Sequence, residues 1–149
     1  FPKAKFILSL RHPCDCVFSC FMQDFDLNNA MANFLNLNDS AHLYNAVMDL
    51  WIQYTSIFSI NYHEVKYENL VVSFETTVRS VLNFLELPWN KSVLEYYKTA
   101  KTRERISTPS YDQVIKPLYS EAKGRWKRYK EKFVNVYPVL EPWIKKFNY

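Results

Sequence analysis

Glycine is nearly absent from this sequence. Among its 149 residues there is a single one, Gly124. Complete nucleotide-binding α/β domains usually contain a glycine-rich phosphate loop, because only glycine lets the backbone approach phosphate groups closely. The sequence cannot form such a loop, and a complete domain of that kind is therefore excluded.

Long hydrophobic runs are also missing. No apolar segment reaches the roughly 20 residues that a membrane-spanning helix needs, and the N-terminal residues lack the pattern of a signal peptide. The sequence starts at Phe1 rather than at methionine. We therefore expect a fragment or a processed product that has no membrane partner.

Paired cysteine motifs and clustered histidines, which bind zinc in many domains, do not occur. Cys14, Cys16 and Cys20 are crowded together without a Cys-x-x-Cys pair or nearby histidine ligands, so no metal site is predicted. We expect reduced, partly buried thiols, which favour a reducing, cytoplasmic compartment. The three histidines lack a paired carboxylate or nucleophile, so the sequence identifies no catalytic residue.

Aromatic and aliphatic residues, in contrast, are abundant. The sequence contains 11 Phe, 11 Tyr and 4 Trp, and 48% of its residues are hydrophobic. This composition provides enough apolar surface to offset the entropy lost on folding, which argues against disorder. The length suits one domain, and we expect residues 1–149 to form a single, partial domain.

The positive charge is concentrated in one segment. Lys98–Lys132 contains 11 basic and 4 acidic residues, whereas the rest of the chain contains 8 basic and 11 acidic ones. A concentrated basic segment favours an anionic partner such as a nucleotide, a polyanion or a nucleic acid. The alternative is a solvated basic surface without a partner.

The pattern of apolar residues predicts an α/β fold that is rich in helices. Lys5–Leu10 shows little alternation, which is typical of a strand buried on both faces of a parallel sheet, and His63–Tyr67 is a second short strand. Helices are predicted over Asp15–Met22, from Asp39 or Ser40 to about Ile60, from Ser73 to Leu85, and over Lys91–Lys98, Glu121–Phe133 and Pro138–Phe147.

Two strands are too few for a stable sheet. The remaining strands are therefore expected from sequence outside this chain or from another chain. An incomplete sheet also leaves open edges and apolar faces, so we expect the isolated chain to self-associate.

Arg11 and Ser19 are the first candidates for a binding site. Arg11 ends the first predicted strand, and Ser19 lies eight residues later, in the second turn of the following helix. Ligands of open α/β sheets bind beyond the carboxyl ends of the strands, where a guanidinium, a hydroxyl and a helix N-terminus can together hold a phosphate. The alternative is a structural salt bridge for Arg11 and a packing role for Ser19.

This Arg-x-Pro element with a serine eight positions after the arginine resembles the 3′-phosphate-binding element of sulfotransferases. Further segments resemble the same family in the same order, and some are similar to the sulfotransferases that follow tetratricopeptide repeats in bacteria or to protein-tyrosine sulfotransferases. These segments are Lys66–Leu70, Val81–Trp89, Thr108–Val114, Asp112–Pro117 and Gly124–Tyr129.

The resemblance implies the C-terminal half of a three-layer, P-loop-like sulfotransferase domain. The parent enzyme would move a sulfuryl group from 3′-phosphoadenosine 5′-phosphosulfate to an acceptor hydroxyl or amine, without a metal, and this chain would hold the 3′-phosphate. The residues that the resemblance assigns to the donor nucleotide are Arg11, Ser19, Tyr67, Ser110, Lys116, Lys123, Gly124 and Arg125.

Two parts of the family pattern are missing: the loop that cradles the 5′-phosphosulfate and the catalytic base. The resemblance therefore implies that this chain cannot catalyse sulfation alone and needs the remainder of the domain. A different hypothesis is a non-catalytic module that binds phosphonucleotides or polyanions. Nucleic-acid binding is not expected, because the basic segment lacks a recognised motif.

Overall fold

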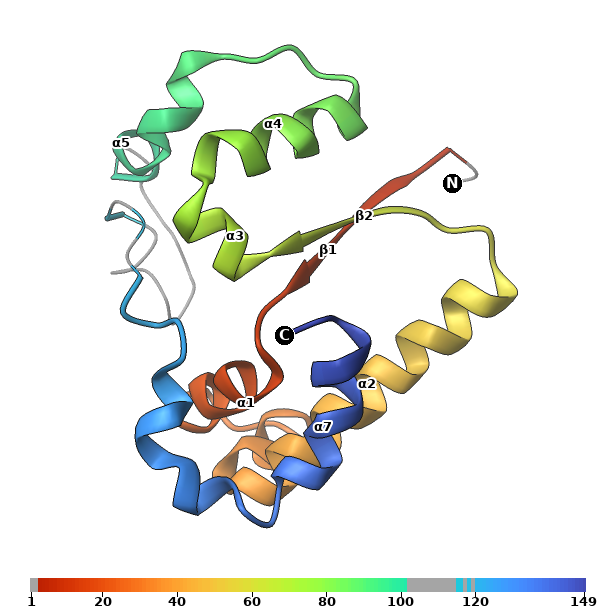
Figure 1. Ribbon diagram of the computed structural model, residues 1–149, viewed down its shortest axis with the longest axis vertical. Coiled ribbons are helices and arrows are strands. Elements are labelled where there is room, and N and C mark those ends of the chain that lie inside the picture. The colour runs from red at the N-terminus through yellow and green to blue at the C-terminus, as the bar shows by residue number, and fades with distance from the viewer. Residues whose placement is uncertain (1–2, 102–114, 117, 119) are drawn as a thin grey trace. The chain divides into compact units, whose positions relative to one another are not determined.

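The computed structural model describes residues 3–101, 115–116, 118 and 120–149. They form two compact units, which are described separately (Figure 1). The first unit consists mainly of Arg11–Asn61 and Glu121–Tyr149, and the second of Ala4–Leu10 and Tyr62–Ser120. Within the described residues, no helix is both long enough and apolar enough to cross a membrane.

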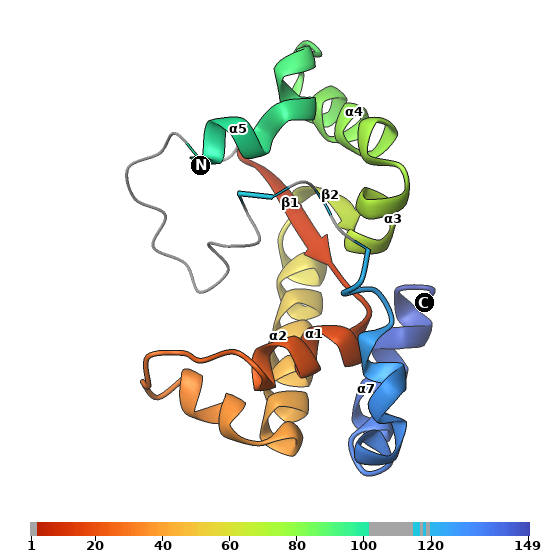
Figure 2. The same cartoon turned by 90° about the vertical axis from the view of Figure 1, so that its left-hand side faces the viewer.

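The first unit is built from helices. Its elements are α1 (Pro13–Phe21), the 3-10 helix η1 (Met31–Leu35), α2 (Leu37–Ile57), the 3-10 helix η3 (Arg125–Phe133) and α7 (Tyr137–Lys146). Helix α1 packs against α2, α7 and η3, and α2 packs against α7 (Figure 2).

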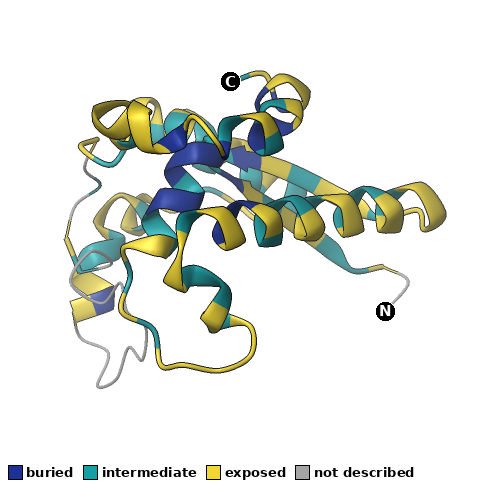
Figure 3. Cartoon of the chain, turned by 90° about the horizontal axis from the view of Figure 1, so that it is seen from below, coloured by how far each residue is buried: buried dark blue, intermediate teal, exposed yellow. Residues whose placement is uncertain are grey.

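The core of this unit lies where these helices meet, and Figure 3 shows the buried residues gathered there. Leu140 and Cys14 are completely inaccessible to solvent, and Phe133 is nearly so. The buried residues of the core are Cys14, Val17, Phe18, Ala41, Phe133, Val136, Leu140 and Ile144.

Helix α1 begins at Pro13, two residues before the predicted Asp15, and the proline lies in its first turn. Proline needs no hydrogen-bond partner there because the first helical amides have none within the helix. The residue before it, His12, caps the helix, and its Nδ1 accepts a hydrogen bond from the amide of Cys14 at 3.2 Å.

Helix α2 begins slightly earlier than predicted, and the predicted cap at Asp39 or Ser40 is wrong. Asn36 is the cap: its backbone is extended, and its Oδ1 accepts a hydrogen bond from the amide of Asp39 at 2.8 Å. The Ser40 hydroxyl instead donates to the carbonyl of Asn36 at 2.7 Å. Asparagine is as good a cap as aspartate or serine, and sequence alone could not choose between neighbouring candidates.

The helical spacing of Leu43, Val47, Leu50, Tyr54 and Ile57 predicts an apolar stripe on α2, and much of this stripe is exposed. The buried residues of α2 lie near its start, whereas Val47, Leu50, Tyr54 and Ile57 are between 44% and 71% exposed. Helical spacing correctly predicted that these side chains share one face. It could not predict what covers that face.

The second unit contains a parallel pair of strands, β1 (Lys5–Leu10) and β2 (Asn61–Lys66), in one sheet. Its other elements are α3 (Tyr67–Val72), α4 (Phe74–Leu85), the 3-10 helix η2 (Lys91–Glu95) and α5 (Tyr96–Lys101). The predicted α/β class, rich in helices with two short parallel strands, is confirmed for the described residues.

One end of α4 is fixed against the strands. Lys5 Nζ on β1 forms an ion pair with Glu86 Oε1 at 2.9 Å, and the His63 ring on β2 stacks on Phe84 with centroids 5.4 Å apart. The prediction that β1 is buried on both faces is wrong, because Phe6 and Ile7 are 48% and 45% exposed. Two strands provide too few neighbours to cover both faces.

Three predicted segments differ in detail. The second strand ends at Lys66, and Tyr67 already begins α3. The predicted helix Lys91–Lys98 consists of η2 followed by α5, and Glu121–Phe133 becomes helical only at Arg125, as a 3-10 helix interrupted at Tyr129. The left-handed backbone of Gly124 immediately precedes that helix and sets its start.

Candidate anion-binding site

Arg11 lies between β1 and α1 and is half-buried. Its Nη2 donates a hydrogen bond of 2.7 Å to the carbonyl of Ala122, which is 111 residues further along the chain. A guanidinium has five N–H donors, so this bond does not preclude a contact with an anion. Arg11 therefore joins the turn after the first strand to the basic C-terminal segment.

Asp15 makes a second connection to the same segment. Its side chain is in the first turn of α1 and the residue is only 1% exposed. Oδ2 accepts a hydrogen bond from the Gly124 amide at 2.6 Å, and Oδ1 accepts one from the Trp126 amide at 2.8 Å. A buried carboxylate needs such bonds because its desolvation is otherwise costly.

A ring contact completes the attachment. The His12 imidazole stacks on the Trp126 indole with centroids 5.2 Å apart, and its other neighbour is the Tyr149 ring at 5.4 Å. We call residues 122–126 the clasped segment, because Arg11, His12 and Asp15 all hold it.

Lys123 and Arg125 project from the clasped segment. The residues on either side of them are held inward and are partly buried, whereas both basic side chains are exposed. The attachment thus leaves two cations available to solvent beside Arg11. Clustered cations of this kind attract a multiply charged anion.

The backbone conformation of Gly124 explains why this position is occupied by glycine. Its φ is +69°, in the left-handed region that other residues avoid. The sequence suggested that this glycine lets the backbone approach a phosphate. In the structure its amide donates to Asp15, and its positive φ forms the turn that places its two basic neighbours.

Ser19 lies on α1 four residues after Asp15 and is half-buried. Side chains four positions apart lie on the same face of a helix. Ser19 therefore belongs to the face of α1 that carries the Asp15 carboxylate, one turn further along.

The remaining predicted site residues belong to the second unit or fall outside the described residues. Tyr67 and Lys116 belong to the second unit. Tyr67 is the first residue of α3, and the exposed Lys116 accepts a hydrogen bond of 3.0 Å at its carbonyl from the hydroxyl of Tyr96. Ser110 lies outside the described residues.

Comparison with known proteins shows which family this chain resembles. The model of the sulfotransferase family matches residues 1–91. The chain is 33% identical over 150 residues to an uncharacterized protein of Aquifex aeolicus, covering 98% of the chain and 19% of that protein. It is 30% identical over 130 residues to protein-tyrosine sulfotransferase 1 of Danio rerio, covering 85% of the chain and 36% of that protein. The chain belongs to the sulfotransferase family.

A further relative is protein-tyrosine sulfotransferase A of Caenorhabditis elegans, with 29% identity over 132 residues. The match covers 85% of this chain and 33% of that protein. This sulfotransferase chain thus spans about a third of the length of its named relatives or less. The family match includes Arg11, Ser19 and Tyr67, whereas the clasped segment lies beyond residue 91.

Sequence reasoning missed the two residues that organise the site, Asp15 and His12. Asp15 is a first-turn acid, which is common in helices, and the sequence does not reveal which amides it faces. The one sequence signal for Asp15 was its position two residues after Pro13, in the helix that directly follows Arg11.

The thiols of α1 form another group near Arg11. Cys16 donates a hydrogen bond to Cys20; this bond, then burial, raises the pKa of Cys16 well above the usual thiol range. The same bond lowers the pKa of Cys20 to about 7, against the effect of burial and with a smaller contribution from the Arg11 charge. Burial raises the pKa of Cys14 to about 12.

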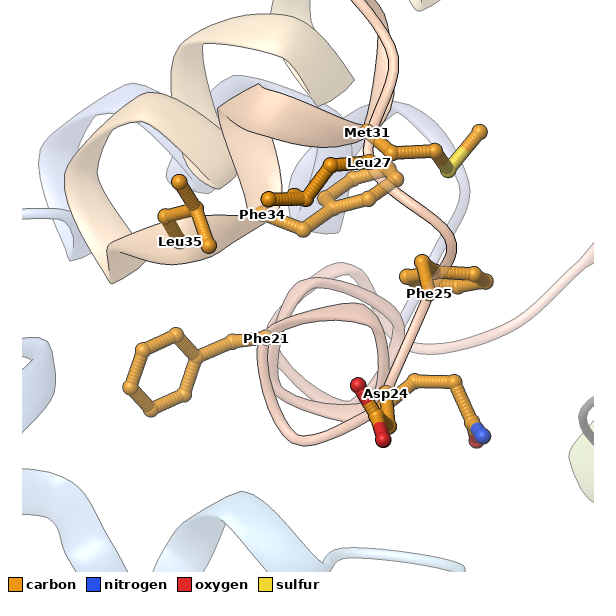
Figure 4. A pocket seen from close by; sticks show the side chains of 8 residues that line it. Phe21, Asp24, Phe25, Leu27, Met31, Phe34 and Leu35 are labelled. Atoms are coloured by element: carbon orange, nitrogen blue, oxygen red, sulfur yellow. The ribbon is translucent and has the colours of Figure 1, made fainter.

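An open pocket of about 230 Å³ lies beyond the end of α1, between that end and η1 (Figure 4). Its walls are mostly apolar and include two polar residues, Asp24 and Gln23. The lining residues are Phe21, Gln23, Asp24, Phe25, Leu27, Met31, Phe34 and Leu35. Among the residues the structure describes, no group of three or more His, Cys, Asp or Glu side chains could hold a metal ion.

Proposed function

We propose that this chain supplies the 3′-phosphate-binding part of a sulfotransferase that uses 3′-phosphoadenosine 5′-phosphosulfate as its donor. The acceptor would be a hydroxyl or an amine. Several relatives are named protein-tyrosine sulfotransferases, which makes a phenolic hydroxyl the first acceptor to test.

The observation that carries the proposal is the bond between Arg11 and Ala122. It brings the turn that follows β1 next to Lys123 and Arg125, although these residues are more than a hundred positions apart. Arg11, which follows the first strand and precedes α1, is thereby held to a segment that carries two further exposed cations, Lys123 and Arg125. A 3′-phosphate carries up to two negative charges, and guanidinium groups bind phosphate in a planar, two-pronged geometry.

The chemistry of sulfuryl transfer explains why such a site matters. The bond between the sulfur and the bridging oxygen of the donor breaks, and negative charge develops on the departing 5′-phosphate. The 3′-phosphate is not part of this reaction, so binding it positions the donor without altering the reacting bond. A base must also remove the acceptor proton. We assign no base in this chain.

The remainder of a sulfotransferase domain would supply what this chain lacks. The exposed residues Phe6 and Ile7 on β1 and the exposed stripe on α2 support this proposal, because large apolar side chains are normally covered. The relatives are long enough to contain such a remainder, because this chain spans 36% or less of the length of each one compared.

A non-catalytic polyanion-binding module is the second candidate. The exposed cations of η3 favour it, because they lie on a surface rather than in a pocket: Lys127, Arg128, Lys130 and Lys132. Binding to a polyanion would be governed by the number of charges and would fall steeply with salt.

Calorimetric titration of the chain with adenosine 3′,5′-bisphosphate, adenosine 5′-monophosphate and a heparin-like polymer tests both proposals. Saturable one-to-one binding of the bisphosphate, much tighter than that of the monophosphate, is the expected result. Equal affinity for the two nucleotides would contradict 3′-phosphate recognition. Binding of the polymer alone would favour the polyanion module.

A further inference from the structure

We propose that Asp15 is the positioning residue of the anion site: its carboxylate fixes the segment that presents Lys123 and Arg125 beside Arg11, without contacting the anion. The inference rests on the proposed function. It goes further because it assigns a role in nucleotide binding to an acidic side chain, which would itself repel a phosphate.

Asp15 and Arg11 hold alternate backbone groups of the clasped segment. The two oxygens of Asp15 accept hydrogen bonds from two amides that alternate along the chain, those of Gly124 and Trp126. Arg11 fixes the carbonyl of Ala122 in the same way. Every second residue of the clasped segment is therefore held from the direction of α1.

The two basic residues of the clasped segment alternate with the fixed ones. Lys123 lies between two fixed residues, and so does Arg125. Both are exposed while their neighbours are partly buried. Fixing the alternate backbone groups orders the basic segment before an anion binds. Binding then costs less conformational entropy, and such preorganisation increases affinity.

Asp15 is deeply buried, and its hydrogen bonds compensate for that burial. At 1% exposure its carboxylate has little access to water, and the two amides replace that solvation. These bonds also occupy the carboxylate. Its charge is directed at backbone donors, while the cationic side chains remain on the solvent side.

The decisive variant is Asp15→Asn, which keeps the size of the side chain but replaces one acceptor oxygen by a donor group. One of the two amides then faces an N–H group, and the clasped segment is released on that side. We expect the affinity for adenosine 3′,5′-bisphosphate to fall by about tenfold or more, since each lost bond to a charged group has that order of effect. The affinity for adenosine 5′-monophosphate should change little.

Asp39→Asn is the matched control. Asp39 also lies in the first turn of a helix, but it is exposed and distant in sequence from the site. It tests the loss of one negative charge. Equal binding of the bisphosphate by the Asp15→Asn and Asp39→Asn proteins would overturn the inference, whereas failure of the unmodified chain to bind would overturn the proposed function instead.

A measurement on the unmodified protein keeps the inference testable if Asp15→Asn does not fold. Gly124 is the only glycine, so labelling with ¹⁵N-glycine gives a single amide signal. We expect that amide proton to exchange slowly and to resonate downfield, as an amide bonded to a carboxylate does, and its signal to shift when the bisphosphate binds. A rapidly exchanging amide, or one whose signal does not move at saturation, would refute the role of Asp15.

Discussion

The Cys16 thiol donates a hydrogen bond to the sulfur of Cys20, one turn further along α1. The bond stabilises a negative charge on the acceptor sulfur and opposes one on the donor. The pKa values of two neighbouring thiols are therefore shifted in opposite directions, although both cysteines lie on the same helix.

This relationship predicts how the cysteines react with iodoacetamide. The pKa of Cys20 is lowered to about 7, so its thiolate forms as the pH rises through 7 and its alkylation rate should reach half its maximum near that pH. Cys14, with a pKa raised to about 12, should not react below pH 9. Mass spectrometry of peptides after short alkylation at several pH values measures both rates.

The Cys16→Ala variant is the control for this titration. Without the donated hydrogen bond, the half-maximal rate for Cys20 should move to higher pH. An unchanged profile in that variant would show that another group lowers the pKa of Cys20.

Arg11→Ala is expected to weaken the binding of adenosine 3′,5′-bisphosphate by about ten- to a hundredfold. The variant removes a charge from the site and also the bond that holds Ala122. Adenosine 5′-monophosphate should bind nearly as before, because it lacks the 3′-phosphate. Arg79→Ala, which removes an exposed arginine of α4, is the charge-matched control, and calorimetry gives the affinity of each of the three proteins for both nucleotides.

The Asn45 side chain stabilises the first unit through Trp143. Its Oδ1 accepts a hydrogen bond of 2.9 Å from the indole Nε1 of Trp143, which is 6% exposed. Asn45→Ala should lower the free energy of unfolding by about 1–3 kcal/mol, because the buried N–H group loses its partner. Asp49→Ala, which removes only the carboxylate that accepts a hydrogen bond of 2.8 Å from the Asn45 Nδ2 and leaves the Trp143 bond in place, should cost less. Urea unfolding curves compare the two, and equal losses would mean that the bond contributes nothing.

The isolated chain is expected to self-associate as its concentration rises, and sedimentation velocity measures this. The apolar stripe on α2 includes Leu50 and Ile57, which are 44% and 71% exposed. Replacing both by lysine should reduce association. Lysines at the exposed polar positions Asn38 and Ser56 of the same helix, on its opposite side, provide the control, and a monomer at every concentration would contradict the prediction.

Local sequence signals correctly predicted the elements that carry the site. Lys5–Leu10 is the first strand with the predicted bounds, and the proline after Arg11 marked the start of α1. Both signals depend on neighbouring residues alone, namely a short apolar run and a fixed proline φ. Helical spacing also identifies the inner face of α4 correctly. The apolar residues at that spacing are all half-buried: Phe74, Val78, Val81, Leu82 and Leu85.

The connection between the two ends of the first unit could not be predicted in this way. Asp15 and Gly124 are 109 positions apart, and nothing in the local pattern of either residue indicates the other. Gly124 was predicted to contact the nucleotide, but neither its positive φ nor its bond to Asp15 could be predicted from the residues around it. Long-range pairing of this kind requires the packing of α1 against η3 to be known.

The last prediction is that this chain has no sulfotransferase turnover by itself. Gly124 is its only glycine, and the amide of this residue is bonded to Asp15 rather than placed to cradle a phosphosulfate. Two of the three histidines are engaged in packing: His12 lies between two aromatic rings, and His63 stacks on Phe84 and bonds to Ser80 at 3.1 Å. Neither is arranged as a base for an acceptor.

Binding of the 3′-phosphate alone cannot align the donor with an acceptor, and alignment accounts for much of the rate of group transfer. The chain should therefore bind adenosine 3′,5′-bisphosphate and still show no transfer of labelled sulfate to phenolic, carbohydrate or peptide acceptors. Protein-tyrosine sulfotransferase 1 of Danio rerio, assayed under the same conditions, is the positive control. Turnover by the isolated chain comparable to that of the control would mean that this half contains catalytic groups we have not identified, and the exposed His42 would be the first residue to replace.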